Sequence, residues 1–225
     1  MIFNSNIFIL FFTAVLLLYW LIRNNQGYRD WLIVVSSFIF YGTWDWRSPG
    51  LLIITGGIDF VCAYKISINP QQTTKKRWLM FSIVSNMGTL GFFKYSGFFL
   101  DSALHILEIF GLQSTRPVLA IILPAGISFY TFQALSYTLD VYRGHIKVET
   151  NPVKYFAFLT FFPQLVAGPI ERASFLLPQF REKRTINESI ILRGVWFILW
   201  GFFLKVVIAD YFAPLVDMVF NVKHL

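Results

Sequence analysis

The sequence has few groups that could support thiol, disulfide or metal chemistry. Cys62 is its single cysteine, which excludes an internal disulfide. The chain has three histidines, and nowhere do Cys and His residues recur at the spacing of a zinc site. We therefore expect neither a resident metal nor a permanently bound cofactor.

Charge is also scarce. Charged residues make up 14% of the 225 positions, whereas hydrophobic residues make up 56%. A typical soluble domain carries about 25% charged residues. Water is a poor solvent for such a chain, and the composition predicts a membrane protein with the lipid bilayer as its surroundings.

Long stretches without charge indicate membrane-spanning helices. A helix needs about 20 mainly apolar residues to cross a bilayer. Residues 1–22 and 117–139 contain no Asp, Glu, Lys or Arg and meet this length. Three shorter stretches become spans if the charged residues at their ends reach the interface, namely residues 31–44, 78–93 and 155–170. We predict an all-α polytopic transmembrane helix bundle of about seven or eight spans, with residues 1–225 as one transmembrane domain.

The few basic residues predict how the chain is oriented. No basic residue precedes Arg23, so residues 1–22 are interpreted as a retained span rather than a cleaved signal. Residues 60–77 contain Lys65, Lys75, Lys76 and Arg77 and no acid. The positive-inside rule places this connection in the cytoplasm and the N-terminus outside. The net charge of +7 therefore reflects orientation in a membrane, and we expect no nucleic-acid partner.

Two segments carry polar residues at helical spacing. In residues 94–112, the residues Lys94, Asp101, His105 and Glu108 follow one another at spacings of seven, four and three. This pattern fits a helix on the membrane surface or a span whose polar stripe faces a wet interior.

The second polar stripe lies within an apolar stretch and consists of Tyr130, Gln133, Tyr137 and Asp140. Unpaired polar groups in hydrocarbon cost on the order of several kcal/mol, so this stripe is expected to face inward. Two interpretations stay open: hydrogen bonding between helices, or the lining of a buried cavity that admits a substrate.

Residues 161–172, FFPQLVAGPIER, break an apolar segment and end in opposite charges. Pro163 and Pro169 stop or kink a helix, and Gly168 permits a close approach of another backbone or a ligand. A break at membrane depth is tolerated where it borders a cavity, so Glu171 and Arg172 are candidates for the rim of a pocket. Proline near the end of a segment is also ordinary punctuation.

Two strings in the sequence resemble a known family. LPAGISFYTFQALSYTLDVYRG from Leu123 and FLTFFPQLVAGPIERA from Phe158 resemble the signature of the membrane-bound O-acyltransferases. They are most similar to the branch of the integral membrane subunit of bacterial alginate O-acetylation. SSFIFYGTWDW from Ser36, FFKYSGFF from Phe92 and FFLKVVIADYFAPLVD from Phe202 also fit this branch.

The resemblance implies a reaction and a set of site residues. Such enzymes move an acyl group, commonly acetyl, from a cytoplasmic thioester such as acetyl-CoA or an acyl carrier to a hydroxyl. In this branch the acceptor is an extracytoplasmic polysaccharide such as alginate, with help from extracytoplasmic partner proteins, and the site is a tunnel through a ring of helices in the bacterial cytoplasmic membrane. The implied tunnel lining and rim are Tyr130, Gln133, Tyr137, Asp140, Pro163, Gly168, Pro169, Glu171 and Arg172. Arg181, Lys183 and Arg184 are expected to attract the phosphates of the donor.

The family's catalytic histidine is not found in the sequence. None of His105, His145 and His224 matches the family's histidine motif. We therefore expect no catalytic residue in this chain, which would then be the N-terminal half of a longer acyltransferase and inactive alone. The alternative function is a non-catalytic membrane transport or assembly subunit, since carriers also contain broken helices. Carriers often have two similar halves, and the sequence shows no internal duplication.

Overall fold

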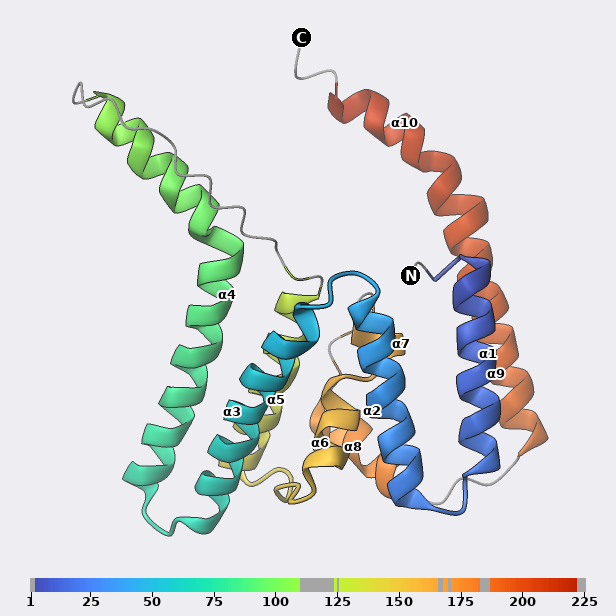
Figure 1. Cartoon of the computed structure of the whole chain (residues 1–225), viewed down its shortest axis with the longest axis horizontal. Coiled ribbons are helices and arrows are strands. Elements are labelled where there is room, and N and C mark those ends of the chain that lie inside the picture. Colours follow the sequence, from blue (N-terminus) through green and yellow to red (C-terminus); the bar gives the residue numbers. More distant parts are fainter. Residues whose placement is uncertain are drawn as a thin grey trace. The chain divides into compact units, whose positions relative to one another are not determined.

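The computed structural model describes residues 3–109, 124, 126–165, 168–169, 171–182 and 187–221 (Figure 1). Every regular element in these ranges is a helix, which confirms the all-α prediction. The chain divides into two compact units. We call Leu18–Glu182 the central unit, and Met1–Leu17 with Lys183–Leu225 the terminal unit. Helix α1 (Asn6–Leu21) crosses from one to the other.

The central unit is built from two groups of helices. In the first group α3 (Ser48–Ile68), α4 (Gln72–Ile109) and α5 (Ile127–Arg143) pack against one another. In the second group α6 (Pro152–Leu159), α7 (Phe162–Leu165) and α8 (Ala173–Arg181) pack against α2 (Gln26–Gly42). Helix α6 also contacts α3 and α5, so the short helices lie between the two groups.

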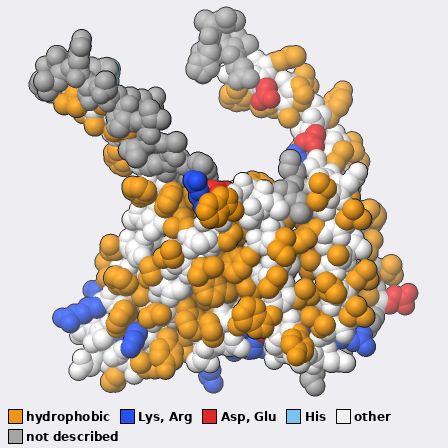
Figure 2. Space-filling view, viewed as in Figure 1, with side chains coloured by type: hydrophobic (Ala, Val, Ile, Leu, Met, Phe, Trp, Pro, Cys, Tyr) orange, Lys and Arg blue, Asp and Glu red, His pale blue; other side chains and the backbone are white. Residues whose placement is uncertain are grey.

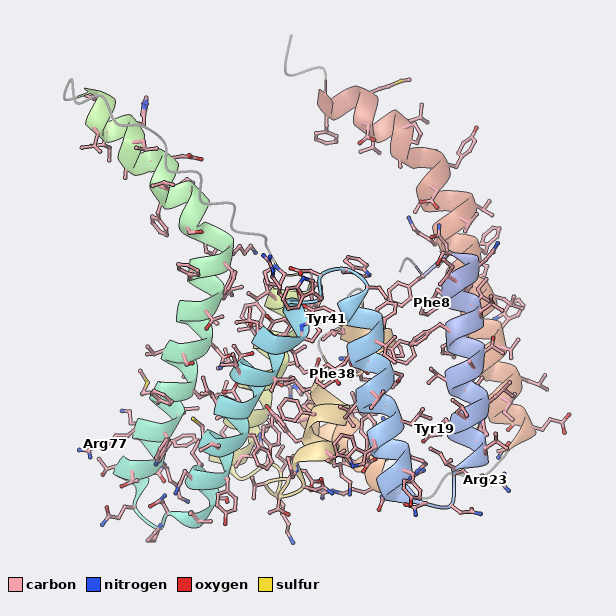
Figure 3. All side chains as sticks on the ribbon, in the orientation of Figure 1. Phe8, Tyr19, Arg23, Phe38, Tyr41 and Arg77 are labelled. Carbon is pink, nitrogen blue, oxygen red and sulfur yellow. The ribbon has the colours of Figure 1, made fainter. Side chains whose placement is uncertain are left out.

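Hydrogen bonds bring several helix termini together at one end of the central unit. Gln72 Nε2 donates to Tyr142 Oη at 3.0 Å, which joins the start of α4 to the end of α5. Gln26 Nε2 donates to the carbonyls of Phe180 and Arg181, at 2.9 and 2.7 Å, which joins the start of α2 to the end of α8. Figure 3 shows Tyr41 and Arg77 at opposite ends of the unit.

This end collects basic side chains, and we call it the basic end. Figure 2 shows Lys and Arg side chains along the lower edge, where Figure 1 places the connection between α3 and α4. The basic residues of the helix termini and connections at this end are Arg23, Lys65, Lys75, Lys76, Arg77, Arg143, Lys147, Lys154 and Arg181.

The helices agree only in part with the predicted spans. Within the described residues, two helices are long and apolar enough to cross a membrane by length and composition: Ser48–Ile68 and the continuous helix Glu188–Phe220. Helix α1 is apolar but shorter. The total of seven or eight spans therefore stays a prediction.

Three predicted segments have different bounds in the structure. The stretch 155–170 is not one span, because α6 ends at Leu159 and α7 begins at Phe162. The stretch 78–93 and the stripe from Lys94 lie on the same helix, α4, whose 38 residues extend over about 57 Å. Of the stretch 117–139, residues 117–123 and 125 lie outside the described residues, as does the side chain of Glu108.

The terminal unit contains one long helix with a local change of winding. Helix α9 (Glu188–Phe202) continues into a π-helical segment (Phe203–Ala209) and then α10 (Asp210–Asn221). The backbone N–H of Asp210 donates to the carbonyl of Lys205, five residues earlier. The same winding brings the Lys205 ammonium against the Asp210 carboxylate as an ion pair. Pro214 follows in α10 and offers no backbone N–H.

Candidate functional site

Residues 149–182 form the last part of the central unit, and both ends of this segment lie at the basic end. We call these residues the re-entrant segment. They begin at the basic end, where Asn151 Oδ1 caps α6 by accepting from Val153 N and Lys154 N at 2.9 and 3.4 Å. They return as α8, whose last carbonyls accept from Gln26 at the basic end. The sequence predicted broken or re-entrant helices, and the structure contains the break, between α6 and α7.

The tip of α6 is buried, and the freed carbonyls there have protein partners. Phe158 and Thr160 are fully buried. The last carbonyls of a helix have no partner within it, and a membrane interior supplies no water to replace one. Gln133 Nε2 donates to Phe158 O at 3.0 Å, and Thr160 donates to Phe156 O from both its N–H and its hydroxyl, each at 2.8 Å. Gln133 is thus a cap for the re-entrant helix.

Helix α3 approaches the re-entrant segment closely at a glycine. A Cβ added at Gly56 would lie 2.5 Å from Leu159 Cδ2 and 3.1 Å from Phe156 Cε1. A Cβ at the neighbouring Gly57 would meet nothing within 4 Å. The close contact at Gly56 therefore allows the tip of α6 to lie directly against α3.

Helix α7 and the residues after it form the turn of the re-entrant segment. The N–H of Phe162 donates to Ser37 Oγ of α2 at 3.2 Å. Gln164 Nε2 donates to Pro169 O at 2.7 Å, and Gly168 N donates to Gln164 O at 2.9 Å. A Cβ at Gly168 would lie 2.6 Å from Gln164 Cα, so this position requires glycine, which has no side chain. The predicted break is present and is closed by hydrogen bonds within the turn.

The predicted rim residues differ in exposure. Pro169 and Arg172 are exposed, whereas Pro163, Gly168 and Glu171 are partly buried. Pro163 lies in α7, and Arg172 directly precedes α8. Their role as a rim stays a prediction.

The stripe on α5 is buried, as expected, and three of its members contact protein groups. Gln133 caps α6 as described above. Tyr137 Oη accepts from the backbone N–H of Glu149 at 2.9 Å, and Asp140 Oδ1 lies 3.5 Å from His145 Nδ1. Tyr130 Oη has no hydrogen-bond partner among the described residues. The contact of Gln133 with α6 matches the interhelical interpretation of the stripe, whereas Tyr137 binds the connection between α5 and α6. The role of the stripe as a tunnel lining stays a prediction.

Charged groups close the re-entrant segment at the basic end. Arg181 donates to Glu149 Oε2 from Nη2 at 2.8 Å and from Nε at 3.2 Å. Arg29 donates from Nη2 to Glu182 O at 3.2 Å, and its guanidinium carbon lies 5.7 Å from the centre of the Tyr19 ring. Arg181, expected to attract donor phosphates, is therefore engaged by a buried carboxylate. Lys183 and Arg184 lie outside the described residues.

Sequence reasoning missed the most connected buried carboxyl group. Asp59 of α3 is 0% exposed and accepts hydrogen bonds from three residues on two other helices. Ser82 and Asn86 donate from α4, the latter at 2.7 Å, and Thr138 donates from α5 at 3.4 Å. Two features of the sequence could have identified this group. Asp59 is a lone ionisable residue in an apolar segment, and Ser82 and Asn86, four residues apart, lie on one face of a helix as possible partners.

Similarity to known proteins extends over the whole chain. The chain is 37% identical to the probable alginate O-acetylase AlgI of Pseudomonas aeruginosa over 100% of its own length and 43% of that protein. It is 36% identical to AlgI of Azotobacter vinelandii over 98% of the chain and 44% of the relative. It is 32% identical to the peptidoglycan O-acetyltransferase of Helicobacter pylori over 98% of the chain and 47% of the relative.

The chain spans less than half the length of these curated relatives. No family model matches, and no solved structure matches. The class that the helices and the relatives define is a helical protein related to O-acetyltransferases. Within that class, the chain is a homologue of the alginate O-acetylases, as the strings from Leu123 and Phe158 predicted.

Proposed function

We propose that this chain is part of a membrane-bound O-acyltransferase. The enzyme moves an acyl group, most simply acetyl, from a cytoplasmic thioester to hydroxyls of an extracytoplasmic polysaccharide. The observation that carries the proposal is the similarity to alginate and peptidoglycan O-acetylases along the whole chain. Relatives that act on two different polymers share the transfer of acetyl to a hydroxyl, so the reaction type is better supported than the acceptor.

The re-entrant segment supports this proposal because it brings a broken backbone into the interior of a helix bundle. Irregular backbone at membrane depth is stable only when other protein groups satisfy it, and Gln133 and Ser37 do so here. Both ends of the segment lie at the basic end, which the positive-inside rule places in the cytoplasm. A thioester donor would approach from that side. We assign this chain a binding and positioning role and no catalytic histidine.

The proposed donor is a substrate, acetyl-CoA or an acyl carrier, and no resident cofactor is required. The basic residues of the basic end would attract its phosphates, with Arg181 held against Glu149 as a fixed part of that surface. Extracytoplasmic partner proteins would complete the transfer to the polymer. In a bacterial cytoplasmic membrane, the donor would lie on the cytoplasmic side and the acceptor polymer on the outer side.

Reconstitution of the full-length protein in proteoliposomes, with its extracytoplasmic partner proteins on the acceptor side, tests this function. Radiolabelled acetyl-CoA is supplied on one side and an alginate oligosaccharide on the other, and labelled ester is counted. Donor-dependent ester formation is the expected result. Movement of the oligosaccharide across the bilayer without donor, and without ester formation, would instead identify a transport protein.

A genetic experiment tests the same function in the source bacterium. Deletion of the gene should remove the O-acetyl groups of a surface polysaccharide, measured by proton NMR of the purified polymer. Wild-type protein supplied from a plasmid should restore them. Unchanged acetylation after deletion would contradict the proposal.

A further inference from the structure

The connection between α2 and α3 exposes aromatic and charged side chains. We call residues 43–47, TWDWR, the outer loop, because they lie at the end of α2 opposite the basic end. Trp46 is 77% exposed, and Trp44 is also exposed. In Figure 3, Tyr41 marks this end of α2. Two exposed tryptophans in a loop of five residues are a candidate surface for binding a ligand.

The outer loop places a cation and a carboxyl group beside the exposed ring. The guanidinium carbon of Arg47 lies 5.5 Å from the centre of the Trp46 ring. Asp45 Oδ1 accepts from the backbone N–H of Arg47 at 3.0 Å. The backbone is fixed by hydrogen bonds from Trp44 N to Tyr41 O and from Ser48 N to Asp45 O, each 3.1 Å. The three side chains are therefore presented by an ordered turn.

The hydroxyl group of Tyr130 is buried at the same end of the central unit as the outer loop. Tyr130 is 1% exposed, and its hydroxyl has no partner among the described residues. Tyr130 lies in the first turn of α5, at the end of that helix opposite the basic end. This hydroxyl leaves room for a hydrogen bond with a polar ligand or water at the same end as the outer loop.

We propose that the outer loop binds the acceptor as a pyranose chain. The apolar face of a sugar ring would stack on Trp46, and sugar hydroxyls would donate to Asp45. The carboxylate of an acidic sugar would pair with Arg47. This inference rests on the proposed function, and it adds where the acceptor is recognised and which side chains recognise it.

The position of the outer loop agrees with this role. The positive-inside rule places the basic end in the cytoplasm, so the outer loop faces the opposite compartment, where a surface polysaccharide lies. Tryptophan also anchors helices at membrane interfaces, and Trp31, which is 55% exposed near the start of α2, fits that simpler role. Anchoring does not explain why Asp45 and Arg47 lie beside the ring.

Calorimetric titration of the full-length protein in phosphatidylcholine nanodiscs tests the proposal. The probes are an alginate hexasaccharide, which is acidic, and cellohexaose, which is neutral. Trp46→Ala should weaken binding of both by about tenfold, because the stacking surface is lost. Trp46→Tyr keeps an aromatic face and should retain most of the affinity. Arg47→Gln should weaken binding of the acidic probe alone.

Trp31→Ala is the matched control and should bind both probes as the wild type does. The proposal is overturned if the wild type binds neither probe, or if Trp46→Ala and Trp31→Ala have equal effects. Equal affinity for the two probes, unchanged by Arg47→Gln, would overturn the assignment of an acidic acceptor. The titration contains no acyl donor, so it tests the binding site alone. Binding in the titration together with no ester formation in the proteoliposome assay would reject the proposed function and keep this site.

Discussion

At the scale of single residues, the central unit depends on polar side chains that would be costly to bury alone. Asp59 is stable inside the bundle because Ser82, Asn86 and Thr138 all donate to its carboxyl oxygens. These bonds join α3 to α4 and α5, so a single carboxyl group links three helices. A buried carboxyl group with several donors from neighbouring helices favours one packing arrangement over its alternatives.

Ser82→Ala removes one donor to Asp59. We expect a loss of about 1–2 kcal/mol in the free energy of unfolding, because a buried acceptor loses a partner. Ser85→Ala is the control, since Ser85 lies on the same helix but is only partly buried. Its effect should stay within about 0.5 kcal/mol. Denaturant unfolding of both variants in the same detergent measures the difference, and equal stabilities would show that the bond to Asp59 contributes nothing.

Gln133→Leu removes the cap of α6. The carbonyl of Phe158 would be left buried without its donor, which costs about 1–3 kcal/mol. Ser136→Ala on the same helix removes only a bond to the carbonyl of Gln133 and should have a smaller effect. Thermal unfolding reports stability, and acetyl transfer in proteoliposomes reports activity. Unchanged activity in Gln133→Leu would exclude a role for this amide in substrate transfer.

At the scale of elements, the re-entrant segment shows which features local sequence can predict. Pro163, Gly168 and Pro169 predicted the break, because proline and glycine act through their own backbone conformations. The return of the chain to the basic end was not predicted in detail. It depends on bonds between residues far apart in sequence, such as Gln26 with Phe180 and Arg181 with Glu149. No local pattern contains that information.

Gly56→Ala tests the contact between α3 and the re-entrant segment. The added methyl group would lie 2.5 Å from Leu159 Cδ2, and Leu159 is buried, so it has little room to move. Overpacking of this kind costs about 1–3 kcal/mol. Gly57→Ala is the matched control, because its methyl group meets nothing within 4 Å, and alanine favours a helix by about 1 kcal/mol over glycine.

The two glycine variants should therefore change the unfolding temperature in opposite directions. A double variant, Gly56→Ala with Leu159→Ala, should lose less stability than the sum of the single variants, because the smaller side chain relieves the clash. Strictly additive effects would mean that the two residues do not contact each other in the folded protein.

At the scale of the whole molecule, the matching strings predicted the relatives of the chain, the alginate O-acetylases. The number of membrane spans was harder to predict from the sequence. Charged residues end the apolar stretches in sequence, whereas α4 continues through Lys94 to Ile109 and residues 155–170 divide between two helices. Helix length in a membrane protein depends on tertiary partners, which hydropathy does not report.

The predicted orientation can be tested with engineered cysteines. Cys62 is the single cysteine of these 225 residues, so Cys62→Ser removes the thiol from this part of the protein, and any cysteine elsewhere in the full-length protein is replaced as well. Asn4→Cys, Thr43→Cys and Lys76→Cys then place one thiol each before α1, in the outer loop and near the start of α4. If the N-terminus is outside and α1, α2 and α3 each cross the membrane, the first two thiols face outward and the third faces the cytoplasm.

A membrane-impermeant maleimide applied to intact cells should label Asn4→Cys and Thr43→Cys, and should label Lys76→Cys only after permeabilisation. Labelling of Lys76→Cys alone in intact cells would reverse the orientation, so that the basic end would face outward and the proposed donor and acceptor sides would be exchanged. Labelling of Thr43→Cys together with Lys76→Cys would mean that α3 does not cross the membrane. Because each outcome assigns a side to the outer loop, the same experiment decides whether an extracytoplasmic polysaccharide can reach Trp46.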